Sequence, residues 1–204
     1  MLNIVLFAPQ IPANTGNIGR TCVVSGTRLH LVEPLGFSLD SKMLHRAGLG
    51  YWENLDVSTY PTWEDFLAKN GLTAPGAQNR LHLLTKKASR TYAQSTYRDG
   101  DYLVFGSEST GIPEDILASL PTSCERIPML PDTASLKNRD AWAAHNDELT
   151  AAAQHAEDPS LLLKQDICGN FIDPADFRIS ALNLSNAAAI VLYEALRQTG
   201  FEGM

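Results

Sequence analysis

Cysteine is scarce in this chain, and its placement excludes the usual cross-linked or metal-bound frameworks. Only three cysteines occur among the 204 residues: Cys22, Cys124 and Cys168. They are odd in number, lie far apart, and show neither Cys-x-x-Cys spacing nor the His/Cys spacing of a zinc site. Disulfide scaffolds and structural zinc sites need such spacing. We therefore expect reduced thiols and a function that needs no metal.

Long apolar runs are also missing. No stretch approaches the roughly 20 apolar residues that a membrane-spanning helix requires. The chain starts directly on an apolar segment, Leu2–Ala8, with no signal-peptide pattern before it. These absences predict a cytoplasmic protein without membrane contact.

Basic residues are not in excess, which argues against a protein that binds nucleic acid over its whole surface. The formal net charge is −7. Two local basic clusters stand out, Lys42–Arg46 and Lys86–Arg90. Each cluster is either ordinary solvated surface or part of a phosphate-binding patch, and the sequence leaves both interpretations open.

Short apolar runs alternate with helical patterns along most of the chain. We expect strands at Leu2–Ala8, Arg28–Glu33, Arg80–Thr85, Asp101–Phe105 and Glu125–Met129, and helices at Ile18–Ser25, Ser41–Ala47, Trp63–Lys69, Pro113–Leu120 and Asn183–Gln198. Such alternation predicts an α/β domain, a parallel sheet with helices on both faces. Residues 136–180 break the pattern. We interpret them as an insertion before the last helix, a surface excursion with no catalytic part.

The first of three polar corners is Asn14–Arg20, between an expected strand and an expected helix. It contains two glycines, two asparagines and a threonine. We expect its backbone N–H groups to be exposed at the helix N-terminus, where they can bind an anion, with the permanent cation of Arg20 beside them. A single corner of this kind is more often only a turn and a helix cap.

Two further corners have similar chemistry. Gly106–Gly111 follows the expected strand that ends at Phe105, and Leu182–Asn186 opens the last helix. Neither the first nor the second corner matches a P-loop or a Gly-x-Gly-x-x-Gly dinucleotide motif. Plain N-capping by Asn183 or Ser185 would also explain the third.

Together, the three corners resemble the signature motifs of the SPOUT, or trefoil-knot, RNA methyltransferases. The chain is most similar to the small tRNA wobble-position 2′-O-ribose methyltransferases of that superfamily. The first motif corresponds to Pro12–Arg20, the second to Phe105–Glu108 with Gly111–Pro113, and the third to Ile127–Met129 followed by Asn183–Ala187. The resemblance covers residues 1–135 and 181–204.

The resemblance implies a single domain over residues 1–204, with a deep trefoil knot at its C-terminal end and the insertion at 136–180 within it. It implies S-adenosyl-L-methionine as cofactor and a homodimer as the active form. The implied substrate is the anticodon stem-loop of tRNA. There the ribose 2′-hydroxyl of the wobble nucleotide, a cytidine or modified uridine at position 34, would receive the methyl group.

Cofactor contacts carried over by position fall at Leu84, Gly106, Ile127 and Ala181. Gly106 permits close backbone approach, and Leu84 and Ile127 can pack on the adenine. The family usually has Ser-x-Asn in the third motif, whereas this chain has Ala181-Leu182-Asn183, with Ser135 before the insertion. Either Ala181 or Ser135 fills the serine position. We favour Ala181, because the cofactor contacts rely mainly on the main chain.

The catalytic residues that the resemblance implies are Arg20, Asn14, Glu108 and Asn183. Arg20 would act as general base or would stabilise the developing alkoxide or a neighbouring phosphate. We favour stabilisation, because an arginine is very hard to deprotonate. Asn14 would orient Arg20 or the ribose, Glu108 would hold Arg20 or a ribose hydroxyl, and Asn183 would fix the third loop.

Two alternatives remain at this point. The chain could methylate another tRNA site or ribosomal RNA. It could also bind RNA or cofactor without catalysis, because the insertion interrupts the third motif.

Overall fold

The computed structural model describes residues 1–39, 50–129, 181–202 and 204. The chain divides into two compact units, Met1–Ile127 together with Leu184–Met204, and Pro128–Asn183. The fold below is that of the first unit. The expected helix Ser41–Ala47, the basic cluster around it, Ser135 and the insertion lie outside the described residues, so the domain organisation predicted for them stays a prediction.

The first unit is built on a six-stranded sheet with the order β3-β2-β1-β5-β4-β6. Every neighbouring pair of strands is parallel. The strands are β1 (Asn3–Phe7), β2 (Arg28–Val32), β3 (Val57–Tyr60), β4 (Leu81–Leu84), β5 (Tyr102–Phe105) and β6 (Cys124–Glu125). The prediction of a parallel α/β sheet is thus confirmed.

Two strand predictions need correction. No sequence pattern indicated β3, the edge strand Val57–Tyr60: its residues alternate poorly, and only Tyr60 is buried. The expected strand Glu125–Met129 is wrong in extent: β6 ends at Glu125. Beyond it the backbone changes partner, since Arg126 forms a bridge with Thr91 instead of continuing along β4.

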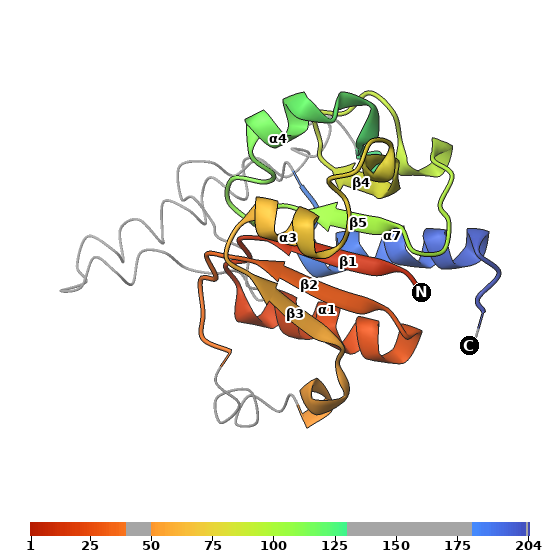
Figure 1. The fold of residues 1–204 in the computed structure, drawn as a ribbon. Coiled ribbons are helices and arrows are strands. Elements are labelled where there is room, and N and C mark those ends of the chain that lie inside the picture. The colour runs from red at the N-terminus through yellow and green to blue at the C-terminus, as the bar shows by residue number, and fades with distance from the viewer. Residues whose placement is uncertain (40–49, 130–180, 203) are drawn as a thin grey trace, which may run out of the picture. The chain divides into compact units, whose positions relative to one another are not determined.

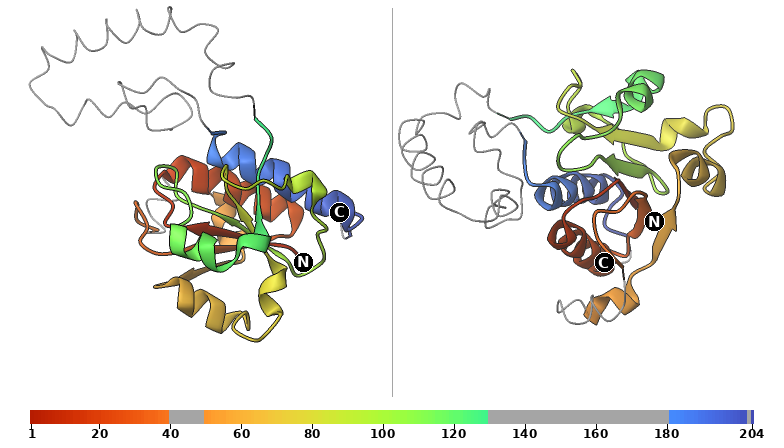
Figure 2. Two further views of the ribbon diagram at one scale, coloured as in Figure 1. Left: turned by 90° about the horizontal axis from the view of Figure 1, so that it is seen from above. Right: turned by 90° about the vertical axis from the view of Figure 1, so that its left-hand side faces the viewer.

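Helices cover both faces of the sheet (Figures 1 and 2). Helices α1 (Pro12–Ser25) and α7 (Leu184–Gln198) lie side by side on one face. Helix α3 (Trp63–Lys69) and the short α4 (Glu114–Ser119) lie on the other. Short 3-10 turns occur at Gly50–Asn54, Ala77–Arg80, Tyr92–Gln94 and Pro121–Ser123. None of the helices in the described ranges is long and apolar enough to cross a membrane.

Helix α1 begins six residues before the predicted start at Ile18, because Pro12 is already favourable at the first helical position. The stretch Asn14–Arg20 is therefore helical and not an exposed corner, and Asn14 is buried. Gly19 serves close packing rather than a turn: a Cβ there would lie 3.0 Å from the Trp52 ring. The expectation of free backbone N–H groups along this stretch was wrong.

The other helix ends shift less. Helix α4 starts at Glu114, so that Pro113 is its N-cap and not its first residue. Helix α7 starts at Leu184, one residue later than predicted. Helix α3 has the predicted bounds, and Thr62 caps it by accepting a hydrogen bond from the Asp65 amide.

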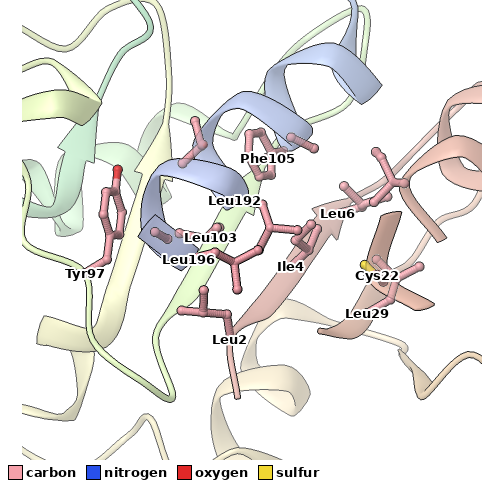
Figure 3. Close-up of a cluster of buried hydrophobic side chains, with 14 of the residues drawn as sticks. Leu2, Ile4, Leu6, Cys22, Leu29, Tyr97, Leu103, Phe105, Leu192 and Leu196 are labelled. Atoms are coloured by element: carbon pink, nitrogen blue, oxygen red, sulfur yellow. The ribbon is translucent and has the colours of Figure 1, made fainter. Parts of the chain in front are cut away.

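Successive strand residues point to opposite faces of the sheet and there pack into two apolar clusters, one on each face. On the α1/α7 face, Leu192 and Leu196 of α7 point toward Ile4 of β1 and Leu103 of β5 (Figure 3). Phe66 of α3 is the largest fully buried side chain on the opposite face. Burial of each such side chain contributes about 1.5–3 kcal/mol.

Cys22 and Cys124 are free thiols, as predicted for the described part of the chain. Cys22 lies inside the α1/α7 cluster, and burial raises its pKa to about 12. It therefore acts as a small apolar side chain.

His30 of β2 is almost fully buried on the α3 face, between the rings of Tyr60, Phe66 and Tyr102. Its Nε2 lies 3.2 Å from Asn3 Oδ1, which can only accept, so Nε2 carries the proton. Its Nδ1 then accepts from the Tyr60 hydroxyl at 2.8 Å. Burial, assisted by the charge of Arg28, lowers the pKa of His30 to about 4.

We predict that His30 makes the fold acid-sensitive. The unfolded chain protonates this histidine near pH 6.5, whereas the folded chain resists protonation down to about pH 4. Stability from His30 is therefore complete above pH 6.5 and is lost as pH falls toward 4. The unfolding free energy of the parent chain should fall between pH 7 and pH 4.5. In His30→Gln this fall should be smaller by roughly 2–3 kcal/mol. Urea denaturation at both pH values measures this, and parallel losses would contradict it.

Candidate active site

Four of the predicted site residues lie at or just beyond the carboxyl ends of the strands: Leu84, Gly106, Glu108 and Ile127. From β1 the chain proceeds outward to β2 and β3, and β5, β4 and β6 then fill the other side. The order reverses between β1 and β5, which are direct neighbours. In open parallel sheets, ligands bind in the crevice beyond the carboxyl ends at such a switch point. The loops that follow β1 and β5 carry two of the three predicted motifs.

Glu108, in the loop after β5, ties these two loops together. Its Oε2 accepts a hydrogen bond from the Gln10 backbone amide at 2.9 Å. Its Oε1 accepts from the Ile11 amide at 3.3 Å and from Asn14 Nδ2 at 3.0 Å. Ile11 is the N-cap of α1 and has no side-chain cap of its own. The carboxylate therefore supplies the missing cap and complements the positive end of the helix.

The loop after β5 is tightly folded on itself. Ser107 and Gly111 exchange two backbone hydrogen bonds, at 3.3 and 3.0 Å. The Ser107 and Thr110 hydroxyls lie 2.7 Å apart. At Gly106 a Cβ would lie 1.9 Å from the carbonyl carbon of Gly111, so only glycine fits. Next to the end of β5, this loop therefore presents main-chain atoms and no side chain.

Three of the four predicted cofactor-binding positions lie on adjacent strand ends. Leu84 ends β4, Gly106 follows β5, and Ile127 lies two residues after β6. The strand register pairs Leu84 with Phe105 on one side and with Glu125 on the other. Leu84 and Ile127 are half-buried and pack on the α1/α7-face core. Together they form an apolar rim next to the backbone of Gly106.

Arg20 lies on a different face of α1 from Asn14. Six residues of helix turn by about 600°, or some 240° net, so the two side chains diverge. Arg20 is exposed, and its guanidinium carbon lies 5.0 Å from the centre of the Tyr51 ring. The structure thus joins Glu108 to Asn14 and Arg20 to Tyr51. The hypothesis that Glu108 holds Arg20 gains no support from these contacts.

Tyr51 is a functional candidate that the sequence did not reveal. Its hydroxyl donates to the Gly16 carbonyl at 2.7 Å, which fixes the ring beneath Arg20. Burial raises the pKa of Tyr51 and Arg20 partly opposes this, so the phenol keeps its proton at neutral pH. No motif or periodicity marks Tyr51, because its partners lie more than 30 positions away along the chain.

Ala181 and Asn183 belong to the second unit, Pro128–Asn183. Asn183 directly precedes α7 in sequence. The roles predicted for both residues stay predictions.

Fold and strand ends together define an α/β protein whose matched motifs lie at the switch point of a parallel sheet, where ligands bind in such folds. Comparison with known sequences makes the class specific. The chain belongs to the SpoU rRNA methylase family, whose model matches residues 1–143. It is therefore a methyltransferase, and the resemblance drawn from the three corners is confirmed.

Two similar proteins match this chain over nearly their whole length, and a third shares the fold over part of its length. A tRNA (cytidine(34)-2′-O)-methyltransferase of Saccharophagus degradans is 38% identical over all of this chain and 99% of its own. A solved structure described as giving insights into 2-OH methylation of C/U34 on tRNA is 31% identical, with TM-score 0.66, covering 97% of this chain and 95% of its own. The SpoU methyltransferase AviRb of Streptomyces viridochromogenes, solved with the cofactor AdoMet, shares the fold: TM-score 0.61 and 18% identity over 100% of this chain and 59% of its own.

We predict that Glu108→Gln lowers the unfolding free energy by about 1–2 kcal/mol. The amide keeps one acceptor but turns its NH₂ group toward an N–H donor, and it removes the charge from the helix end. Glu64→Gln is the matched control, since Glu64 is an exposed acid in the first turn of α3. Urea denaturation of both variants should show a loss below about 0.5 kcal/mol for the control. Equal losses would show that Glu108 acts only through its charge.

Proposed function

We propose that this chain transfers a methyl group from S-adenosyl-L-methionine to the ribose 2′-hydroxyl of the wobble nucleotide of tRNA, a cytidine or modified uridine at position 34. The observation that carries the proposal is the full-length similarity to a tRNA (cytidine(34)-2′-O)-methyltransferase. The strand-end site supports it, because Asn14 and Glu108, which belong to two of the matched motifs, are hydrogen-bonded there.

The residues at the strand ends fit the adenosyl group. Leu84 and Ile127 offer half-buried apolar surface on which an adenine can pack. Gly106 is buried, and its missing side chain leaves room for the Gly111 backbone of the same loop. A relative of the same fold was solved with this cofactor. When bound, S-adenosyl-L-methionine supplies an electrophilic methyl group on a sulfonium.

The chain's own task is to present the 2′-oxygen and to stabilise the charge that develops on it. A ribose hydroxyl is a weak nucleophile at neutral pH, so alignment and electrostatic stabilisation carry the rate. Arg20 supplies a permanent cation from an exposed position. Tyr51 restricts the guanidinium to one direction through the ring below it. We assign to Arg20 the role of stabilising the developing alkoxide or binding the adjacent phosphate.

Asn14 and Glu108 serve the reaction by geometry. Their hydrogen bond, with those from Gln10 and Ile11, sets the start of α1 against the loop after β5. This fixes the direction of the helix that carries Arg20. Asn14 and Glu108 thus act as positioning residues, and a ribose hydroxyl contact by either belongs to the same proposal.

The remaining expectations complete the proposal. The active form is a cytoplasmic homodimer with its site completed at the subunit interface. The C-terminal segment forms the trefoil knot, with Ala181 or Ser135 at the cofactor and Asn183 fixing the third loop.

Mass spectrometry of nucleosides tests the reaction. Purified protein is incubated with S-adenosyl-L-methionine and tRNA transcripts carrying cytidine or uridine at position 34. We expect a 2′-O-methyl group at position 34 and nowhere else. A methyl group at another tRNA position, or only on ribosomal RNA, would replace the proposed substrate. Cofactor binding without transfer would identify a non-catalytic binding protein.

We predict that Arg20→Lys lowers kcat by about 100-fold while the Kd for S-adenosyl-L-methionine stays within twofold. Lysine keeps the charge but lacks the planar fork. Arg28→Lys is the control, since Arg28 lies at the start of β2, at the opposite end of the strands, and pairs with exposed Asp56. Retention of parental kcat in Arg20→Lys would refute the assigned role.

A further inference from the structure

A buried network of charged and polar side chains lies beside the proposed cofactor rim. Glu125, the last residue of β6, is fully buried. Its carboxylate accepts hydrogen bonds from the Tyr97 hydroxyl at 2.7 Å and from the Ser95 hydroxyl. His82 of β4 places Nδ1 3.4 Å from Glu125 and Nε2 3.2 Å from the Asp101 carboxylate. We call these five residues the buried network.

His82 carries a positive charge within this network. Burial alone would lower its pKa, but hydrogen bonds to Asp101 and Glu125 and the charges of both carboxylates raise the pKa to about 9. Arg90 adds a second cation from the rim, with its guanidinium 3.9 Å from Glu125. The two buried carboxylates are therefore both partnered, as such groups must be.

Such a network adds little net stability. Removing an imidazolium and two carboxylates from water costs several kcal/mol, and apolar side chains of similar volume fill such sites without that cost. What a buried ionic network does well is select one arrangement of the segments that it joins.

The segments joined here need this support. Strand β6 has two residues and pairs with β4 only at Leu83–Cys124 and Leu84–Glu125. Beyond Glu125 the chain relies on residues 90–97: the Arg126 amide donates to the Arg90 carbonyl, and the Tyr92 amide to the Arg126 carbonyl, both at 2.9 Å. Ile127 follows immediately. Its position thus depends on how residues 90–97 are held.

The buried network holds that segment. The hydroxyls of Ser95 and Tyr97 donate hydrogen bonds to Glu125, so this residue of β6 holds residues 90–97 in place. Gln198 of α7 also binds this segment: its side chain accepts a hydrogen bond from the Tyr97 amide and donates one to the Ser95 carbonyl. Tyr97 lies beside the apolar cluster under α7 (Figure 3).

We propose that Glu125 and His82 are positioning residues for the cofactor site, which lock residues 90–97 onto the end of β6 and thereby set Ile127 opposite Leu84. The ligand in this inference rests on the proposed function. The mechanical part concerns the chain alone, so the two can be tested separately.

Glu125→Gln is the sharpest variant, since it keeps size and removes the charge. His30→Gln is the matched control, a buried histidine network on the opposite face of the sheet. Hydrogen exchange of the free protein is measured first. Exchange of residues 90–97 and 124–127 should accelerate about tenfold in Glu125→Gln and not in His30→Gln. Unchanged exchange there, or equal acceleration in both variants, would overturn the proposal.

Calorimetric titration with S-adenosyl-L-methionine then tests the link to the cofactor. The Kd of Glu125→Gln should rise about tenfold, while kcat at saturating cofactor stays within twofold. A parental Kd would overturn the link. If the parent chain itself binds no cofactor, the proposed function fails and the exchange comparison alone decides the mechanical part. Should Glu125→Gln not fold, Tyr97→Phe removes one donor to Glu125 and leaves its charge partnered.

A pH series adds a readout that simple destabilisation would not reproduce. The titratable groups that face His82 are Asp101, Glu125 and Tyr97. Arg90 pairs with Glu125, and Glu194 of α7 lies near Tyr97. The raised pKa of His82 means that its contribution is complete below pH 6.5 and is lost as pH rises through 9. The parental Kd should therefore weaken between pH 7 and 9.5, and that of Glu125→Gln should change less. Parallel pH profiles would contradict the role of His82.

Discussion

The carboxylate of Glu108 is the contact on which the proposed site depends. It reaches from the loop after β5 to the first backbone amides of α1 and to Asn14. A helix that starts with Pro12 and has no side-chain cap needs an acceptor at this point. The same contact fastens the loop that begins at Gly106. One side chain therefore relates the helix that carries Arg20 to the strand ends where the cofactor is proposed to bind.

Each face of the sheet contains a buried histidine, and the two histidines differ in charge. His30 has a hydroxyl and an amide oxygen as partners, and burial keeps it neutral. His82 has two carboxylates as partners and is charged in spite of burial. Desolvation acts on both rings, so the charge of the partner decides the outcome. The neutral histidine joins β2 to β1 and to the edge strand β3, whereas the charged one lies next to β6 and the proposed cofactor rim.

Much of the fold could be predicted because buried parallel strands are nearly continuous apolar runs, and β1, β2, β4 and β5 were recognised with ends correct to within one residue. The edge strand β3 was not predicted, because only one of its residues is buried and it shows no apolar pattern. The start of α1 was misplaced because glycine and asparagine usually indicate a turn. Here Gly19 is explained instead by the ring of Trp52, which packs against that face of the helix.

The sequence by itself determined the sheet class, because hydrophobic periodicity is a local property of the chain, and its three motifs indicated the family through their resemblance to known proteins. Only the tertiary structure decided which of those residues meet. It placed Glu108 on Asn14 and the α1 backbone, Arg20 on Tyr51, and Glu125 among His82, Tyr97 and Ser95. These partners are separated by about 30 to 100 positions in the chain. Contacts over such distances depend on strand order and helix rotation, which no local pattern records.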